Sequence, residues 1–260
     1  MAYQDIRTDR DGPALVITFN RPVRRNAIAV ATMREIMQAL DEAAAEDAVR
    51  AVIFTGGPDY FSAGADLNDA LAIEGAKDGV DYFKRWHALT GAMETLDKPV
   101  LAAIEGFCLT GGLELALACD IRIAGAGASF AITSARIGTV AGAGGTQRLP
   151  RIVGQAKALE LLFAAEPIDA EEAYRIGLIN RLAVAGEALE TAEAMVRLYQ
   201  ERAPMSLGFA KRAVRGGMQM DLVSGLAYET MLAATIYGTA DRREGISAFL
   251  EKRRPDFTGA

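Results

Sequence analysis

Short apolar runs alternate with helical patterns along the first half of the chain. The strand-like runs are 14–19 (ALVITF), 51–55 (AVIFT), 100–104 (VLAAI) and 120–124 (DIRIA), and glycine-bearing loops follow the later ones. Between the first two runs, apolar residues from 28 to 44 recur at the three- and four-residue spacing of an amphipathic helix. This alternation predicts an α/β fold in which the loops gather at one end of the strands.

The second half of the chain has a different character. From Val153 onward helical periodicity dominates, over 156–165, 170–176, 186–201, 206–215, 222–236 and 242–251. These segments are rich in Ala, Leu and Met, so we expect them to pack on a neighbouring element or on another subunit. No stretch rich in Pro, Gly or Ser separates two independent domains.

Composition and charge exclude several classes of protein. The chain has 260 residues and a formal net charge of -6, which argues against nucleic acid as a partner because phosphate binding needs clustered Lys and Arg. Its first residues lack the apolar core of a signal peptide, and no apolar run approaches the ~18 residues of a membrane span. Cys108 and Cys119 are expected to be buried, reduced thiols. The expectation is a cytoplasmic protein that binds neither nucleic acid nor a membrane.

Motifs for several kinds of chemistry are absent. His87 is the single histidine, and its place in a predicted helix favours a structural role. No residues have metal-ligand spacing, so no metal is predicted. No serine lies in a G-x-S-x-G elbow, and the glycines that end at Gly145 lack the lysine of a Walker A loop.

Two glycine-bearing loops stand out on chemical grounds. Residues 61–67 read FSAGADL, and residues 109–119 read LTGGLELALAC. In the second loop Gly111 opens an apolar helix, whose first N–H groups have no helical partner and can face an anion. Glu114 follows three residues later, on the same side of the helix. The pattern predicts an acid or base beside an anion hole; the alternative is an ordinary first-turn glutamate that favours the helix dipole.

These loops belong to a longer series of segments that resemble the signature blocks of the crotonase (enoyl-CoA hydratase/isomerase) superfamily. In family order they are TFNRPVRRNAI, FSAGADL, GFCLTGGLELALACDIRIA, RIGTVAGAGGTQRLPRIVG and DRREGISAFLEKRRPDF, over residues 10 to 257. The resemblance implies an α/β spiral of ββα units over 1–195 and a helical C-terminal region over 196–260. It further implies assembly as a trimer or a dimer of trimers, and an acyl-CoA thioester as substrate.

The resemblance also implies roles for individual residues. The backbone N–H groups of Ala65 and Gly111 form an oxyanion hole for the thioester carbonyl, and such donors are worth about 3–4 kcal/mol each. Lys252, often from a neighbouring subunit, reaches the CoA phosphate. Family members often carry Lys where this chain has Val23, so Arg24 or Arg25 is expected to supply that charge. The stretches that bind CoA include Arg24, Arg25, Ala27, Ala63, Asp66 and Leu67. No cofactor is implied beyond the CoA of the substrate.

This chain departs from the family pattern at one catalytic position. Hydratases of the family hold one water between two glutamates; Glu114 matches the first, but Ser134 occupies the place of the second. A serine hydroxyl holds a water but is no base at neutral pH. Losing one positioned acid or base typically lowers the rate ~10²–10⁴-fold. Two softer departures are Thr110 and Ala141, which stand where glycine and proline are common.

We therefore expect hydration of a 2-enoyl-CoA, with Glu114 transferring the proton while Ser134 and the loop around Gly142 place the water. Double-bond isomerisation or acyl-CoA decarboxylation stays open, because one carboxylate is enough for either, although isomerases of the family usually keep the second acid. A non-catalytic CoA-binding protein that has lost the second glutamate also stays open, although the retained Glu114 disfavours it. Trp86, Phe83 and Met93 are expected in the core rather than along an acyl tunnel.

Overall fold

The computed structural model describes residues 3–260. Its strands are β1 (Ile6–Asp11), β2 (Ala14–Phe19), β3 (Ala51–Thr55), β4 (Val100–Ile104), β5 (Phe107–Leu109), β6 (Ile121–Gly125), β7 (Ser129–Ala131), β8 (Ile168–Asp169) and β9 (Arg181–Ala183). Its helices are η1 (Pro22–Arg24), α1 (Val30–Ala45), α2 (Leu67–Leu71), α3 (Ala76–Thr95), α4 (Gly111–Ala118), η2 (Ser134–Ile137), α5 (Gly145–Val153), α6 (Gln155–Ala164), α7 (Ala170–Arg175), α8 (Ala188–Gln200), α9 (Pro204–Gly217), α10 (Leu222–Ile236) and α11 (Ala240–Leu250).

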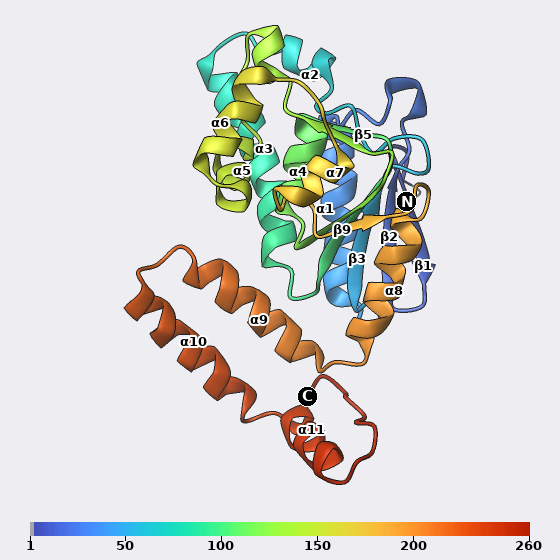
Figure 1. Ribbon diagram of the computed structural model, residues 1–260, viewed down its shortest axis with the longest axis vertical. Coiled ribbons are helices and arrows are strands. Elements are labelled where there is room, and N and C mark those ends of the chain that lie inside the picture. Colours follow the sequence, from blue (N-terminus) through green and yellow to red (C-terminus); the bar gives the residue numbers. More distant parts are fainter. Residues whose placement is uncertain (1–2) are drawn as a thin grey trace.

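A six-stranded sheet in the order β1-β2-β3-β4-β6-β9 forms the centre of the molecule (Figure 1). β1 and β2 form an antiparallel hairpin, and every later pair in this sheet is parallel. Parallel neighbours need crossover connections, which α1 provides between β2 and β3 and α3 between β3 and β4. A second sheet of three strands, in the order β5-β7-β8, carries the segments that lead into α4 and η2.

Alternating side chains of the central strands fill two cores, one on each face of the larger sheet. On β3, Val52 and Phe54 belong to the larger core with residues of α1 and α4, whereas Ile53 belongs to a smaller core that α8 covers. Every residue of β3 and β4 is buried. Strands that are covered on both faces read as continuous apolar runs, which is why the sequence predicts them so clearly.

The predicted α/β class is confirmed, and so are most element bounds. β2, β3 and β4 coincide with the predicted runs, and β6 begins one residue later than predicted. The apolar pattern does not predict β1, because its sequence IRTDRD is polar and only its first residue is buried at the sheet edge. β5 and β7–β9 have two or three residues each, too few to show a period.

The loops that follow β3 and β4 meet at one end of the sheet, as the sequence predicts. Leu109 donates its backbone N–H to the Ser62 carbonyl at 2.9 Å. Gly106 permits this approach, because a Cβ atom there would lie 2.0 Å from the Asp59 carbonyl oxygen. The two glycine-bearing loops singled out in the sequence are therefore in direct contact.

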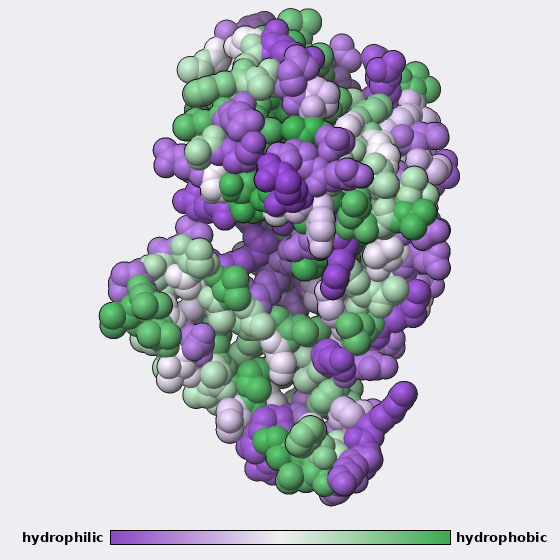
Figure 2. Space-filling model, in the orientation of Figure 1, coloured by the Kyte–Doolittle hydropathy of each residue, from purple (hydrophilic) through white to green (hydrophobic). Residues whose placement is uncertain are grey.

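The C-terminal helices α9, α10 and α11 lie apart from the sheet, at the opposite end of the molecule from α2 (Figure 1). α9 and α10 pack against each other, but α10 has no buried residue. Large hydrophobic side chains are exposed on and beside these helices: Val214, Met218, Leu222, Val223, Leu226, Met231, Phe249 and Leu250. Hydrophobic patches are visible over this region in the lower half of Figure 2. The expected boundary between residues 195 and 196 falls inside α8 and stays a prediction.

Within residues 3–260, no helix is both long enough and apolar enough to cross a membrane.

Candidate active site

The segment after β3 runs beside the segment before α1, and backbone hydrogen bonds join the two. Ala63 donates its N–H to the Arg25 carbonyl at 3.0 Å, and Ile28 donates to the Gly64 carbonyl at 2.7 Å. Gly64 has a φ of 108°, in the left-handed region where a side chain would be strained. The two stretches that the family resemblance assigns to CoA therefore lie side by side.

Two backbone N–H groups at this junction find no acceptor among the described residues: those of Ala65 and Gly111. Gly111 is the first residue of α4, where helix geometry leaves the N–H unpaired. A Cβ atom on Gly111 would lie 2.9 Å from the Ala65 nitrogen and 3.0 Å from the ring of Trp86. The two peptide groups are thus close neighbours, and only a glycine fits between Ala65 and the indole.

Thr110 introduces this pair in a backbone conformation that favours glycine, with φ 41° and ψ -112°. Its hydroxyl lies 2.8 Å from the Thr133 hydroxyl and accepts a hydrogen bond from the Thr133 N–H at 3.1 Å. The strain explains why glycine suits this position. The Thr133 contact also ties the start of α4 to the segment that carries Ser134.

Glu114 lies one helical turn after Gly111, with 3% of its surface exposed. Its Oε1 accepts hydrogen bonds from the backbone N–H groups of Ala143 and Gly145, both at 2.8 Å. Its other oxygen, Oε2, receives no hydrogen bond from the part of the chain that the structure describes. One oxygen therefore anchors the carboxyl group, and the other is available for chemistry.

The surroundings of Glu114 set its protonation. Burial raises the pKa of Glu114, while the N–H groups of Gly145 and Ala143 and the charge of Arg148 act to lower it. A carboxyl group whose pKa is raised toward neutral pH is suited to accept and return a proton. The alternative of an ordinary first-turn glutamate does not account for a carboxyl that is buried and anchored through a distant loop.

Ser134 begins η2 and is 4% exposed. Its carbonyl accepts a hydrogen bond from Thr139, whereas its hydroxyl makes none with residues 3–260. Gly142 precedes the turn that anchors Glu114 and packs against Phe83, whose ring would lie 2.3 Å from a Cβ atom on Gly142. The structure thus joins the Gly142 loop to Glu114, and the Thr110–Thr133 contact brings Ser134 to the same end of α4.

The residues expected to bind CoA differ in what their side chains do. Arg24, Arg25 and Leu67 are exposed, whereas Ala27 and Ala63 are partly buried. The Asp66 side chain serves the fold instead: it pairs with Arg21 at 2.9 Å and caps α2 through the Asn68 N–H at 3.0 Å. Burial acts to raise the pKa of Asp66, but these contacts hold it below its ordinary value. Asp66 is therefore a carboxylate whose bonds are used within the protein.

Lys252 follows α11, at the end of the molecule away from α4 (Figure 1). The structure does not bring it near Glu114, Ala65 or Gly111 of the same chain. Its expected contact with CoA would therefore have to come from a neighbouring subunit, and that role stays a prediction.

Other candidate chemistry has no support in the structure. No group of His, Cys, Asp and Glu among residues 3–260 is arranged to hold a metal ion. Cys108 and Cys119 are buried and unpaired with each other. Burial raises the pKa of Cys119 to about 12, so its thiol stays protonated and is a poor nucleophile. His87 is exposed, on the side of α3 away from the core.

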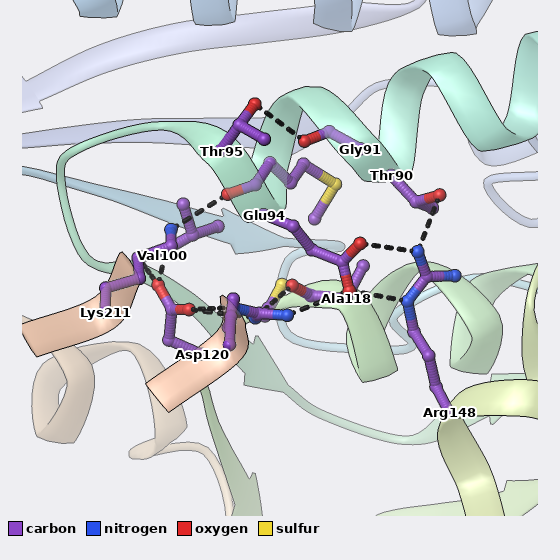
Figure 3. A network of polar contacts seen from close by, with 12 residues as sticks. Thr90, Gly91, Glu94, Thr95, Val100, Ala118, Asp120, Arg148 and Lys211 are labelled. Carbon is purple, nitrogen blue, oxygen red and sulfur yellow. Dashed lines mark hydrogen bonds and ion pairs between the residues drawn. The ribbon is translucent and has the colours of Figure 1, made fainter. Parts of the chain in front are cut away.

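Two residues that hold the anchoring turn of Glu114 in place, Arg148 and Glu94, were not predicted from the sequence. Arg148 on α5 forms a bidentate ion pair with Glu94 on α3, with both nitrogen–oxygen distances 2.7 Å (Figure 3). Arg148 also donates to the carbonyl of Ala143, whose N–H holds the Glu114 carboxylate. Arg148 lies in the TQR run of the fourth signature block, so its segment was recognised. Nothing in the sequence alone, however, indicates that Arg148 pairs with Glu94.

Comparisons with known proteins give one consistent answer. A family model described as enoyl-CoA hydratase/isomerase matches residues 10–260. A short-chain-enoyl-CoA hydratase of Clostridium acetobutylicum is 38% identical over 258 residues, which cover 98% of this chain and 97% of the relative. A crotonyl-CoA hydratase of Syntrophomonas wolfei is 36% identical over 261 residues, with 99% of both chains covered. A solved enoyl-CoA hydratase from Bacillus anthracis superposes with a TM-score of 0.94 at 35% identity, covering 99% of this chain and 100% of its own.

The raised pKa of Glu114 predicts a pH-dependent effect on stability. A carboxyl whose folded pKa lies above its unfolded value of about 4.3 stabilises the fold below that value and loses this contribution as the pH rises through the folded pKa. Glu114→Gln keeps an oxygen for both N–H groups but carries no charge. We expect this variant to melt at a higher temperature than the wild type at pH 8, by a margin that shrinks as the pH falls toward about 4.

Thermal unfolding followed by circular dichroism measures the margin. Glu74→Gln, an exposed change in the loop between α2 and α3, is the matched control and should show no comparable gain in melting temperature at pH 8. A Glu114→Gln variant less stable than the wild type at pH 8 would contradict the assignment of Glu114 as a strained, buried acid.

Proposed function

The chain belongs to the enoyl-CoA hydratase/isomerase family, and we propose that it catalyses the reversible addition of water to the double bond of a 2-enoyl-CoA. The family predicted from the signature blocks is confirmed by the model match over residues 10–260. Relatives that match nearly the whole chain are named as hydratases of short-chain enoyl-CoA and crotonyl-CoA. The observation that carries the proposal is the buried Glu114, whose Oε2 has no partner among the described residues, one turn from the unpaired Gly111 N–H.

The two unpaired N–H groups act on the thioester carbonyl. When water adds to the double bond, negative charge develops on the carbonyl oxygen as an enolate forms. Ala65 and Gly111 offer fixed donors to that oxygen, and Gly111 adds the positive end of the α4 dipole. A donor that is already oriented needs no rearrangement during the reaction, so each contributes about 3–4 kcal/mol to the transition state.

Glu114 carries the proton in both halves of the reaction. As the oxygen of water forms its bond to C3, the O–H bond breaks and the proton passes to Oε2 of Glu114. The electron pair of the double bond moves toward the thioester and forms the enolate. Glu114 then returns the proton to C2 as the carbonyl re-forms, so one carboxyl group acts as base and then as acid. Ser134 and the Gly142 loop place the water beside Oε2, a role that a hydroxyl can fill without titrating.

Isomerisation of the double bond remains the second candidate for this site. The observation in its favour is Ser134 itself, because moving a proton between two carbons needs one carboxylate and no activated water. The same consideration keeps acyl-CoA decarboxylation open. Both alternatives use the same donors at Ala65 and Gly111, so they change the reaction but not the class of substrate.

CoA is the handle of the substrate, and no separate cofactor is needed. The exposed Arg24 and Arg25 lie next to the paired stretches 25–28 and 63–66, where they provide positive charge for the phosphates. Ala27, Ala63 and Leu67 line the same edge, with Asp66 holding the loop in shape. The reduced, buried cysteines fit a cytoplasmic location, which we also propose.

A homo-oligomer, a trimer or a dimer of trimers, is the proposed state of the protein. The exposed apolar side chains of α9 and α10 form a surface that a single chain leaves uncovered (Figure 2). Covering it with a second copy would also bring Lys252 to another subunit's CoA. Light scattering coupled to size exclusion tests this: we expect a mass of three or six chains for the wild type. A monomer at micromolar concentration would overturn both the assembly and the role of Lys252.

The function is tested by hydration of crotonyl-CoA, followed as the loss of enoyl absorbance. We expect activity in the wild type and a loss of at least about 10²-fold in Glu114→Gln, because the carboxamide neither accepts nor returns the proton. Binding of a saturated acyl-CoA, measured by calorimetry, should be unchanged in that variant. Equal activity of the wild type and Glu114→Gln would refute the assignment, and binding without turnover across acyl-CoA substrates would indicate a non-catalytic protein.

Ser134→Glu separates the hydratase from the isomerase reading. If the enzyme is a one-glutamate hydratase, a second carboxylate beside Glu114 perturbs a site that already works, and we expect no gain in hydration. Hydration that appears only in Ser134→Glu would mean that the natural reaction is a different one. Ser134→Ala is the matched control, because it removes the hydroxyl without adding a charge; it should slow hydration if the hydroxyl places the water.

A further inference from the structure

A network of charged side chains connects α9 to Arg148 on α5; Lys211, Asp120, Glu94 and Arg148 are labelled in Figure 3. Arg148 on α5 binds both oxygens of Glu94 on α3 at 2.7 Å and also donates to the Thr90 hydroxyl at 3.1 Å. Glu94 is shared with Arg215 on α9, whose Nη1 lies 2.8 Å from Glu94 Oε1. The two arginines thus hold one carboxylate between them.

Arg148 lies directly on the anchoring turn. Its Nη1 donates to the Ala143 carbonyl at 3.3 Å, and a Cβ atom on Gly144 would lie 1.8 Å from that same nitrogen. The other side of the turn offers the N–H groups of Ala143 and Gly145 to Glu114 Oε1. The turn at residues 143–145 is therefore hydrogen-bonded to the Arg148 guanidinium on one side and to the Glu114 carboxyl group on the other.

Arg215 extends this support to the helix that carries Glu114. Its Nη2 donates to the carbonyl of Ala118, the last residue of α4, at 2.8 Å, and to Asp120 Oδ1 at 2.8 Å. Asp120 also pairs with Lys211 of the same α9 at 2.8 Å. α9 therefore contacts the C-terminal end of α4 directly. Through Glu94 and Arg148 it is also connected to the turn that anchors Glu114.

We propose that Arg148 is a positioning residue for Glu114, and that Glu94 and Arg215 carry the same support to α9, so that the seating of the C-terminal helices on the core sets the geometry of the reactive carboxyl group. The proposal rests on the function proposed above for Glu114. It goes beyond that function because none of these three residues hydrogen-bonds to Glu114 itself. They act through the turn, through the end of α4 and through charge.

The charged and titratable groups around Glu114 determine how its pKa responds to each substitution. Arg148, from α5, lowers the pKa of Glu114, and Glu94, from α3, lies behind Arg148. Burial acts to raise the pKa of Glu94, but Arg148 and Arg215 hold it below its ordinary value, so Glu94 is ionised. Tyr82 on α3 is a neutral neighbour, because burial and nearby carboxylates, Glu114 among them, raise its pKa. β5, which also packs on α4, contributes Cys108, whose pKa burial raises well above the usual thiol value.

Removing either member of the Arg148–Glu94 pair must then shift Glu114 in opposite directions. Arg148→Met removes the positive charge that acts to lower the pKa of Glu114 and leaves Glu94 paired with Arg215 alone, so the pKa of Glu114 rises. Glu94→Gln removes the negative charge and leaves Arg148 unneutralised, so the pKa of Glu114 falls. Since hydration needs ionised Glu114, the acid limb of kcat/KM moves to higher pH in Arg148→Met and to lower pH in Glu94→Gln.

The experiment measures the titration of Glu114 and the kinetics on the same full-length variants. NMR of protein labelled with ¹³C at the glutamate carboxyl carbons, with Glu114→Gln to assign the signal, gives the titration without any turnover. Crotonyl-CoA hydration against pH gives kcat and KM. We expect kcat of Arg148→Met to fall up to about 100-fold with KM little changed, because the turn that aims the carboxylate is released. Arg148→Lys keeps the charge but not the two-pronged grip, so it should keep the wild-type acid limb and lose part of kcat.

Matched controls come from the same helices. Arg151 on α5 contacts only Gln147 among the described residues, and Arg212 on α9 pairs with Asp97 at the surface. Arg151→Met should leave kcat and the acid limb unchanged. Arg215→Met should lower kcat, whereas Arg212→Met should not. If Arg215→Met behaves like Arg212→Met, the link to α9 is wrong.

The hydratase function and the positioning role of Arg148 are tested by different measurements. If the wild type does not hydrate crotonyl-CoA, the proposed function fails, but the carboxyl titration still decides whether Arg148 and Glu94 control Glu114. If hydration is present and Arg148→Met and Glu94→Gln move the titration in the same direction, or not at all, the positioning role is overturned. Variants that lose melting temperature without moving the titration would assign these residues to stability alone.

Discussion

The anchoring of one buried carboxyl group by two backbone N–H groups is the constraint on which the rest of the site depends. Glu114 is almost fully removed from water, and its ionised form is stabilised there by the N–H groups of Gly145 and Ala143, which donate to Oε1, and by the charge of Arg148. Those donors come from a turn about 30 residues away in sequence, so α4 and α5 must be packed together before the group can function. A buried carboxyl group that must carry a charge is costly for stability and useful for proton transfer.

The fold supplies the second half of the site by leaving backbone donors unused. Parallel strands end at one edge of the sheet, and the loops after β3 and β4 meet there because Gly106 lets their backbones approach. The meeting places the Ala65 N–H beside the start of α4, where helix geometry leaves Gly111 unpaired. The Gly111 donor and the Glu114 carboxyl group thus belong to the same helix, whereas the Ala65 donor comes from the loop after β3.

Much of this was readable from the sequence, and the exceptions have physical reasons. β3 and β4 are covered on both faces and appear as unbroken apolar runs, and Gly111 and Glu114 sit at a spacing that helix geometry interprets directly. β1 escaped because an edge strand needs no apolar alternation. The ion pair of Asp66 with Arg21 was not predicted, because Arg21 lies 45 residues earlier, a separation that no local pattern reveals. The ion pair between Arg148 and Glu94 was not predicted for the same reason, because it forms only when α3 and α5 pack together.

The replacement of a second glutamate by Ser134 has a consequence for how the remaining one must be held. Where two glutamates hold the water between them, as in hydratases of the family, both carboxylates determine its position. With one, the direction of Oε2 and the protonation of Glu114 are set by the turn and by charges around it alone. In the proposed mechanism the hydroxyl of Ser134 places the water but, unlike a carboxylate, adds no negative charge. The grip of Arg148 on the Ala143 carbonyl, and the attachment of α9 to both Glu94 and the end of α4, therefore bear directly on catalysis rather than on stability alone.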